Sequence, residues 1–229
     1  MDAESLAECQ DCDVELYLKP TGYIDSDHPD VVNYAAERVK GLDSALDKAV
    51  KLYYAVRDDI RYDPYAFGLG GETFKASTVL ADKKAFCVPK AILLAAVCRA
   101  QGIPARLGFA DVRNHLASDG LLQMMRTDVF AFHGYADIYL EGRWVKATPA
   151  FNRQMCEKFD VLPLEFNGRE DSVFHAFDGS GRQHMEYLKE HGHFADFPPE
   201  ELVKSYGEHY PHFFAGAGAE TMLERIKLK

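Results

Sequence analysis

The chemistry available to this chain begins at Cys87, the first residue of a helix that the pattern predicts over residues 87–101. Pro89 suits the first turn of that helix, and Gly102 suits the position just past its end. The segment is apolar nearly all round, so we expect the helix in the core. Unpaired N–H groups and the helix dipole favour a negative charge at its start, which can lower a thiol pKa from about 8.5. Cys87 is therefore a candidate nucleophile, and a small buried residue is the plain alternative.

A cysteine nucleophile needs a base, usually histidine, and a third group that orients the imidazole. The candidate base is His133, which lies on a predicted β-hairpin. We expect its strands over residues 130–140 and 143–150, joined by a tight turn near Glu141 and Gly142. A lone histidine on a strand is more often structural, so its importance depends on Cys87.

The register of this hairpin decides which side chains share a face with His133. A turn centred between residues 141 and 142 produces an opposite-charge pair and an aromatic pair, both favourable across strands. These pairs are Asp137 with Lys146 and Tyr139 with Trp144. The same register places Thr148 and Asn152 as the diagonal neighbours of His133. Either residue could orient the imidazole.

The other cysteines are predicted to be structural. Cys98 lies eleven residues after Cys87, about 16 Å along the helix axis, which is too far for a disulfide. Cys98 is therefore expected to fill the core, and Cys156 has no evident partner. Cys9 and Cys12 have the spacing of half a zinc site, but no second half follows.

The remaining histidines offer weaker alternatives. His191 and His193 resemble half of a metal site, but a glycine-flanked surface loop is the simpler explanation, and we expect that loop. They motivate a third hypothesis, a metal-dependent hydrolase, which neither an H-E-x-x-H motif nor paired C-x-x-C motifs support. His115 is a weaker base candidate at a strand end, and His175 and His184 carry no signal. We therefore predict no metal and no cofactor.

Further elements are expected on both sides of this centre. A strand is predicted at Val14–Leu18, and a helix start at Ser26–Pro29. Helices are predicted over residues 42–60 and 78–82, and a strand over residues 106–112. In the last third of the chain, helices are predicted over residues 183–190 and 199–207.

Two long segments resemble the transglutaminase-like superfamily of the bacterial type. They are CVPKAILLAAVCRAQGIPAR from Cys87 and HGYADIYLEGRWVKATP from His133. The resemblance covers roughly residues 30–152. It implies an α+β, papain-like core in which a buried cysteine-bearing helix packs on an antiparallel sheet. It also implies that Cys87 is the nucleophile and His133 its base, acting through a thioester without a metal.

The third catalytic position departs from the pattern of that family. The family has an aspartate four residues after the hairpin tryptophan, and this chain has Thr148. A neutral oxygen can accept a hydrogen bond from the imidazole, but it stabilises an imidazolium less than a carboxylate does. Asn152 could take the role instead, as asparagine does in papain-like enzymes. Ala85 is a smaller departure, at a position that is often glycine.

These residues support two functional hypotheses. The first is a cysteine-dependent acyl-transfer enzyme that acts on a peptide, a protein or a small amide. Water as acceptor would make it a hydrolase, and an amine would make it a transglutaminase. The second is a catalytically impaired binding or scaffold protein, for which Thr148 is the reason.

Length and charge restrict the remaining possibilities. The 229 residues fit a core over residues 1–160, with helices in its N-terminal part, and an irregular appendage over residues 161–229 packed on it. The net charge of −10 disfavours nucleic acid and anionic membranes as partners, and favours a basic or neutral substrate. No leader or membrane span is recognised, so a cytoplasmic protein with reduced thiols is expected.

Overall fold

The computed structural model describes residues 14–66, 70–115, 117–173, 185–216 and 218–228. The helices are α1 (Pro29–Arg38), α2 (Ala45–Asp59), α3 (Ala76–Asp82), α4 (Cys87–Ala100), α5 (Asp119–Met125), α6 (Arg153–Lys158), α7 (Pro199–His209) and α8 (Ala219–Ile226). Short 3₁₀ helices lie at η2 (Val14–Leu18), η3 (Gly71–Phe74) and η4 (Pro211–Phe214). None of the described helices is long and apolar enough to cross a membrane.

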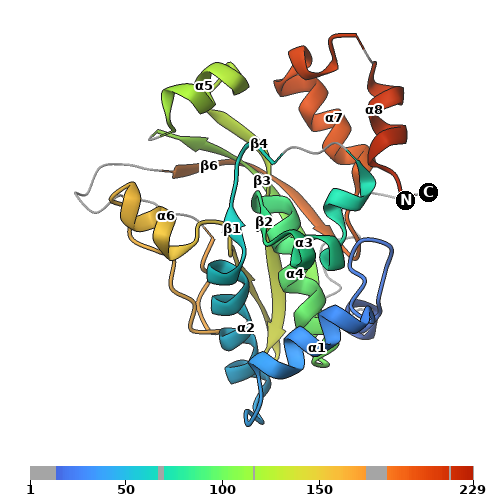
Figure 1. Cartoon of the computed structure of the whole chain (residues 1–229), viewed down its shortest axis with the longest axis vertical. Coiled ribbons are helices and arrows are strands. Elements are labelled where there is room, and N and C mark those ends of the chain that lie inside the picture. Colours follow the sequence, from blue (N-terminus) through green and yellow to red (C-terminus); the bar gives the residue numbers. More distant parts are fainter. Residues whose placement is uncertain (1–13, 67–69, 116, 174–184, 217, 229) are drawn as a thin grey trace, which may run out of the picture.

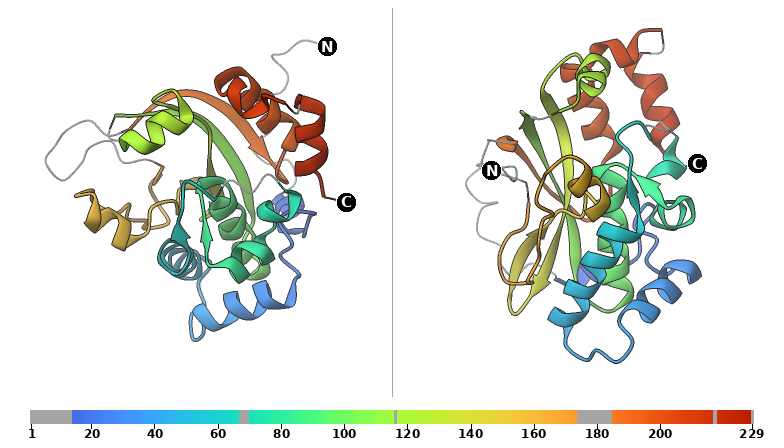
Figure 2. Two further views of the ribbon diagram at one scale, coloured as in Figure 1. Left: turned by 45° about the horizontal axis from the view of Figure 1, so that its top comes forward. Right: turned by 60° about the vertical axis from the view of Figure 1, so that its left-hand side comes forward.

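The centre of the fold is an antiparallel sheet of four strands in the order β5-β4-β3-β6. Its strands are β3 (Ala105–Asn114), β4 (Val129–Leu140), β5 (Arg143–Ala147) and β6 (Met185–Phe194). A short parallel pair, β1 (Arg61–Tyr62) and β2 (Lys84–Ala85), stands beside it. Helices α1 to α4 cover one face of the sheet, with α4 nearest to it (Figures 1 and 2). The predicted α+β fold, with a cysteine-bearing helix on an antiparallel sheet, is confirmed.

Helix α4 is the core of the molecule because its sequence leaves no polar face. Every residue from Val88 to Arg99 is buried. The helix begins at Cys87, as predicted. It ends before Gly102, whose φ of 71° is the left-handed conformation expected just past a helix end.

The start of α4 packs unusually close to β4, and Gly134 makes this possible. A Cβ atom added to Gly134 would lie 2.9 Å from the Cα of Val88 and 3.2 Å from its Cγ2. The first of these contacts is with backbone, which cannot rotate away. The absence of a side chain at Gly134 therefore lets the residue after Cys87 approach the residue after His133.

Two buried basic side chains of this helix donate hydrogen bonds to backbone carbonyls of neighbouring segments. Lys90 Nζ donates to the carbonyls of Arg57 and Ile60, at 2.8 and 2.6 Å, where α2 ends. Burial lowers the pKa of Lys90 to about 7. At the other end of α4, the Arg99 guanidinium donates to three carbonyls from separate parts of the chain. Those acceptors are Lys19, Ala105 and Ala195, at 2.7 to 2.8 Å.

The predicted register of the β4–β5 hairpin is confirmed from the turn to the Ala136–Ala147 pair, and the ladder does not reach His133. Asp137 pairs with Lys146 and Tyr139 with Trp144. Strand β5 is shorter than predicted, however, because it ends at Ala147. Pro149 has no N–H to continue the ladder, and the Thr148 N–H donates instead to the Ser172 carbonyl at 2.8 Å.

Two predicted elements outside the centre are wrong. The strand expected at Val14–Leu18 is a 3₁₀ helix, whose Tyr17 packs edge-on against Trp144 at 5.1 Å. The helix expected over residues 183–190 is instead the edge strand β6, from Met185 on. Both segments depend on tertiary contacts that local sequence does not reveal. For β6, that contact is with the open edge of β3.

The later part of the chain contributes directly to the central sheet. Strand β6 pairs with β3, and α7 contacts β4. Helix α7 extends over the predicted range of residues 199–207. The division into a core over residues 1–160 and an appendage over residues 161–229 stays a prediction. The central sheet takes strands from both sides of that boundary.

Gly134→Ala should lower the free energy of unfolding by about 1–3 kcal/mol, since the new methyl group meets the backbone of α4. Gly207→Ala on α7 is the matched control, because nothing lies within 4 Å of its added Cβ. The control should stay within about 1 kcal/mol of wild type. Urea unfolding curves measure both, and equal stability of the two variants would contradict the close packing.

Candidate active site

Cys87 occupies the first position of α4 with its side chain partly exposed. The preceding residue, Phe86, provides no side-chain cap for the first turn. The nearby N–H groups of Gly134, Val88 and Cys87 itself favour the thiolate and lower the thiol pKa. Burial acts more strongly in the opposite direction and raises the pKa of Cys87 to about 11. The expectation of a lowered thiol pKa is therefore wrong for this resting state, because removal from water outweighs the helix start.

His133 lies on β4, directly before Gly134, the glycine that packs against the start of α4. It lines one small cavity together with Cys87, of about 30 Å³, which is room for about one water molecule. Burial lowers the pKa of His133 to about 4, so the imidazole is neutral at neutral pH. The structure thus brings the predicted nucleophile and base together as a neutral thiol and a neutral imidazole.

The backbone before His133 is held in an unusual conformation by Asp111. Phe132 has a φ of 59°, in the left-handed region that a bulky residue rarely adopts. Its N–H donates to Asp111 Oδ1 at 2.9 Å, where the β3–β4 register shifts in a bulge. The same Oδ1 is 2.7 Å from His191 Nε2 on β6. Bulges beside sites re-aim side chains, and this one sets the direction of the strand at His133.

Three tyrosines surround Cys87 on the sides away from the sheet. Tyr62 comes from β1, Tyr206 comes from α7, and Tyr210 directly follows α7. All three line the small cavity, and burial raises the pKa of each, so their hydroxyls are neutral. The Tyr210 hydroxyl accepts from the Ala131 N–H at 2.6 Å, which ties α7 to the strand of His133.

The structure separates the two candidates for the third catalytic role. Asn152 is buried and lines a larger cavity together with His133, and its Oδ1 accepts from the Tyr62 N–H at 3.0 Å. Thr148 is also buried, but it is not among the described residues that line either cavity. Its Oγ1 has no hydrogen-bond partner among the described residues. Which of the two orients His133 stays a prediction.

The larger cavity has a volume of about 690 Å³ and meets the small one at His133. Tyr62, Pro64, Leu121 and Phe130 line both cavities, so these side chains stand between Cys87 and the larger space. A substrate of more than a few atoms therefore has room in the larger cavity only. It would reach the thiol where the two cavities meet.

The other histidines have structural partners. His191 and His193 lie on strand β6, so the expectation of a surface loop is wrong. His193 Nε2 is 3.2 Å from Asp137 Oδ2, and His115 Nε2 is 3.0 Å from a Glu186 oxygen. Across the described part of the chain, no three His, Cys, Asp or Glu side chains gather as metal ligands. His175 and His184 lie outside the described residues.

The cysteines predicted to be structural are free and buried where the structure describes them. Cys98 is fully buried in α4, and Cys156 is buried in α6. Burial raises their pKa values to about 12 and about 11. Cys9 and Cys12 lie outside the described residues.

Sequence reasoning missed Asp111 and the tyrosines that surround the thiol. Asp111 had a detectable signal, because it is a carboxylate inside an otherwise apolar strand segment, LGFADV. Such a side chain must find partners when it is buried. Tyr206 and Tyr210 had no such signal, since their contact with Cys87 depends on how α7 packs.

Comparison with known proteins supports this arrangement at the level of the family. The family model described as the transglutaminase-like superfamily matches residues 32–149, a range that includes Cys87, His133 and Thr148. No curated protein matches the chain.

Two solved structures are similar to this chain. One is described as a candidate cysteine protease from Cytophaga hutchinsonii, with 16% identity, a TM-score of 0.48, and 80% of this chain and 55% of that chain covered. The other is a candidate protease from Parabacteroides distasonis ATCC 8503, with 16% identity, a TM-score of 0.38, and 58% and 25% covered. The chain thus spans little more than half of the first protein and a quarter of the second.

The rate of iodoacetamide alkylation at Cys87 should rise steadily from about pH 6 to about pH 10. Below a pKa of about 11, the thiolate fraction grows tenfold per pH unit. His133→Asn is the matched control and should give the same curve, because a neutral imidazole holds no charge near the sulfur. Peptide-resolved mass spectrometry separates Cys87 from Cys98 and Cys156. A plateau below about pH 7 in wild type would instead reveal a thiolate–imidazolium pair.

Proposed function

Because the chain belongs to the transglutaminase-like superfamily, we propose that it is a cysteine-dependent acyl-transfer enzyme with Cys87 as nucleophile and His133 as base. One observation carries the proposal. The thiol and the imidazole line the same small cavity, and Gly134, directly after His133, packs closely on Val88, directly after Cys87. A nucleophile and base on facing elements are what covalent acyl transfer requires.

The proposed reaction has two halves that share one base. Cys87 Sγ attacks the carbonyl carbon of an amide or ester while His133 takes the thiol proton. The bond to the leaving group then breaks, and His133 returns the proton to the departing amine, which leaves a thioester on Cys87. First-turn N–H groups of α4, which have no side-chain cap, are the donors we assign to the oxyanion. Water or an amine then releases the acyl group and restores the thiol.

The resting protonation states explain why proton transfer must accompany attack. The thiol pKa of about 11 and the imidazole pKa of about 4 differ by about seven units. Because burial favours the neutral form of both groups, forming a separate ion pair before attack is unfavourable. Attack on a bound carbonyl avoids this state, since charge moves from the sulfur to the oxyanion as the proton moves. A group that stabilises the imidazolium would then matter for rate.

The acyl donor we propose is a peptide, a protein or a small amide, with hydrolysis as the simplest outcome. A reducing, cytoplasmic setting would suit a catalytic thiol that must stay free. Transamidation and hydrolysis proceed through the same thioester on Cys87 and differ only in whether an amine or water accepts the acyl group.

A second candidate function is a binding or scaffold protein with little catalytic power. Two observations favour it: Thr148 replaces the carboxylate of the family, and the thiol pKa is raised rather than lowered. This alternative predicts that Cys87 forms no acyl intermediate. An experiment that detects acylation of Cys87 therefore distinguishes the enzyme from the scaffold protein.

Incubation with p-nitrophenyl acetate should acetylate Cys87 in wild type, detected as one added acetyl group by peptide mass spectrometry. Cys87→Ala should show no such adduct. His133→Asn should slow acetylation by about 10²-fold or more, the usual contribution of a general base. Cys98→Ala is the matched control, because this buried thiol lies at the other end of α4. A wild type that remains unacetylated while folded would support the scaffold protein.

Variants at the two candidate orienting residues should differ in the same assay. Asn152→Ala should slow acetylation of Cys87 by about tenfold or more, whereas Thr148→Val should change it less than about twofold. The reason is that Asn152 shares a cavity with His133 and Thr148 does not. Asn152→Asp is the control, since it keeps an oxygen acceptor for the Tyr62 N–H. A larger loss in Thr148→Val than in Asn152→Ala would assign the role to Thr148.

A further inference from the structure

The larger cavity beside His133 has a distinct chemical lining. Its described walls are rich in aromatic and apolar side chains. They include Tyr65, Phe130, Phe151, Met155 and Phe159. Two of them stay largely open to solvent, since Tyr65 is 56% exposed and Phe159 is 52% exposed. Large apolar surfaces left open at the edge of a cavity are typical of binding sites.

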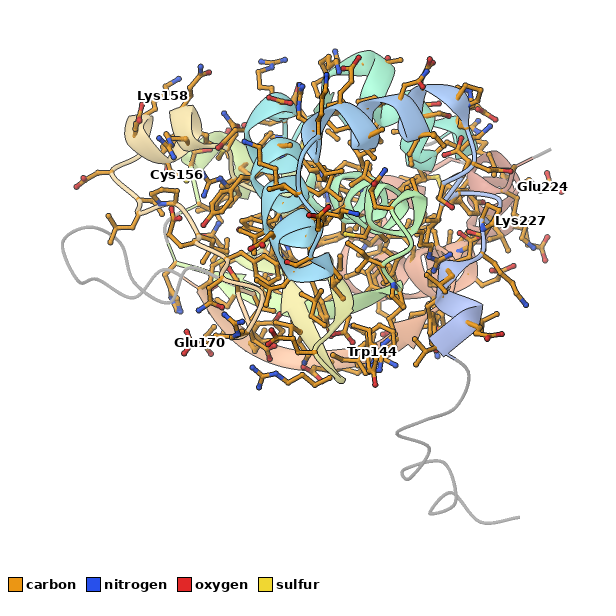
Figure 3. The ribbon with its side chains drawn as sticks, turned by 90° about the horizontal axis from the view of Figure 1, so that it is seen from below. Trp144, Cys156, Lys158, Glu170, Glu224 and Lys227 are labelled. Atoms are coloured by element: carbon orange, nitrogen blue, oxygen red, sulfur yellow. The ribbon has the colours of Figure 1, made fainter. Side chains whose placement is uncertain are left out.

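The charged side chains of this lining are of one sign. Arg61 comes from β1 and Lys158 from the end of α6, and no carboxylate is among the described residues that line the cavity. Arg61 has Asp63 as a neighbour at 3.5 Å, outside the lining. Lys158 has no ion pair among the described residues and stands near the Phe159 ring, at 5.7 Å. Figure 3 shows Lys158 on α6 at the edge of the molecule, so this cation belongs to the rim of the cavity.

This local charge opposes the charge of the whole chain. Asp and Glu number 36 against 26 for Lys and Arg, yet the described cavity wall carries only cations. Charges farther from a ligand than about 8–10 Å are largely screened at physiological ionic strength. Two carboxylates pair with lining residues, Asp63 with Arg61 at 3.5 Å and Glu186 with His115 at 3.0 Å, which leaves Lys158 as the main cation for a ligand. The whole-chain preference for a basic or neutral substrate therefore does not decide the ligand of this cavity.

We propose that this cavity binds an acyl donor that combines an aromatic or large aliphatic group with a carboxylate. The apolar group would pack among the aromatic walls, and the carboxylate would pair with Lys158 and Arg61 at the rim. The inference rests on the proposed function in one respect, which is that the reactive carbonyl would lie toward His133. It specifies the substrate class of that site.

Two fluorescent probes that differ by one charge test the proposal on the full chain. Dansylglycine carries an aromatic group and a carboxylate, and dansylglycinamide is its neutral counterpart. Fluorescence titration should give a dissociation constant about fivefold lower for dansylglycine. Lys158→Gln and Arg61→Gln should each weaken dansylglycine about two- to fivefold and leave dansylglycinamide unchanged, as expected for exposed ion pairs. Lys51→Gln, an exposed lysine on α2, is the matched control and should change neither probe.

The location within the cavity is checked with Phe159→Ser. This change should weaken both probes, because it removes an aromatic wall from an exposed position that the fold does not need. Equal binding of the two probes, or no binding of either, would overturn the proposal. A preference for dansylglycine that survives in the Lys158→Gln/Arg61→Gln double variant would overturn it as well, since the anion site would then lie elsewhere. Binding needs no reactive thiol, so a failure of Cys87 acetylation would refute the proposed function separately.

Discussion

The site depends on one close contact, between the first turn of α4 and strand β4 at Gly134. Strand β4 can approach the Cα of Val88 this closely because Gly134 carries no side chain, and the nearby Gly134 N–H lowers the thiol pKa of Cys87. His133 precedes this glycine and is carried to the same place. A Cβ at this position would lie 2.9 Å from the Cα of Val88, so the helix or the strand would have to shift. The contact thus explains both the tight packing of the core and the pairing of the two reactive groups.

The surrounding structure restrains that contact from both directions. On the strand side, Asp111 holds Phe132 in a left-handed conformation immediately before His133. Its other partner, His191, belongs to β6, so the later part of the chain bears on the backbone at the site. Helix α7 adds Tyr210, which binds the β4 backbone and covers the thiol. These contacts make the last third of the chain part of the site, whatever domain boundary is drawn.

Local pattern was sufficient to predict the parts of the site that short-range chemistry determines. The start of α4 at Cys87 follows from an apolar segment bounded by helix-start and helix-end residues, and the hairpin register follows from complementary pairs across a tight turn. Strand β6 could not be found this way, because its role comes from the open edge of β3. The thiol pKa was missed for a related reason. The helix start lowers it, but the extent of burial depends on α7 and β1, which lie far away in the sequence.

Burial has opposite consequences for the two halves of the proposed site. At the thiol and imidazole it favours the neutral forms, so in the proposed reaction the developing charge would pass to a bound carbonyl. A carboxylate beside His133 would ease this step, but position 148 is a threonine, and its hydroxyl lies outside both cavities. The larger cavity, by contrast, keeps its cations at an exposed rim where they remain charged at little cost. An anionic substrate could then be recognised in water at the rim while its carbonyl enters the dry region beside Cys87. In this proposal, charged side chains at the rim recognise the substrate, whereas the thiol and imidazole stay neutral until the carbonyl is attacked.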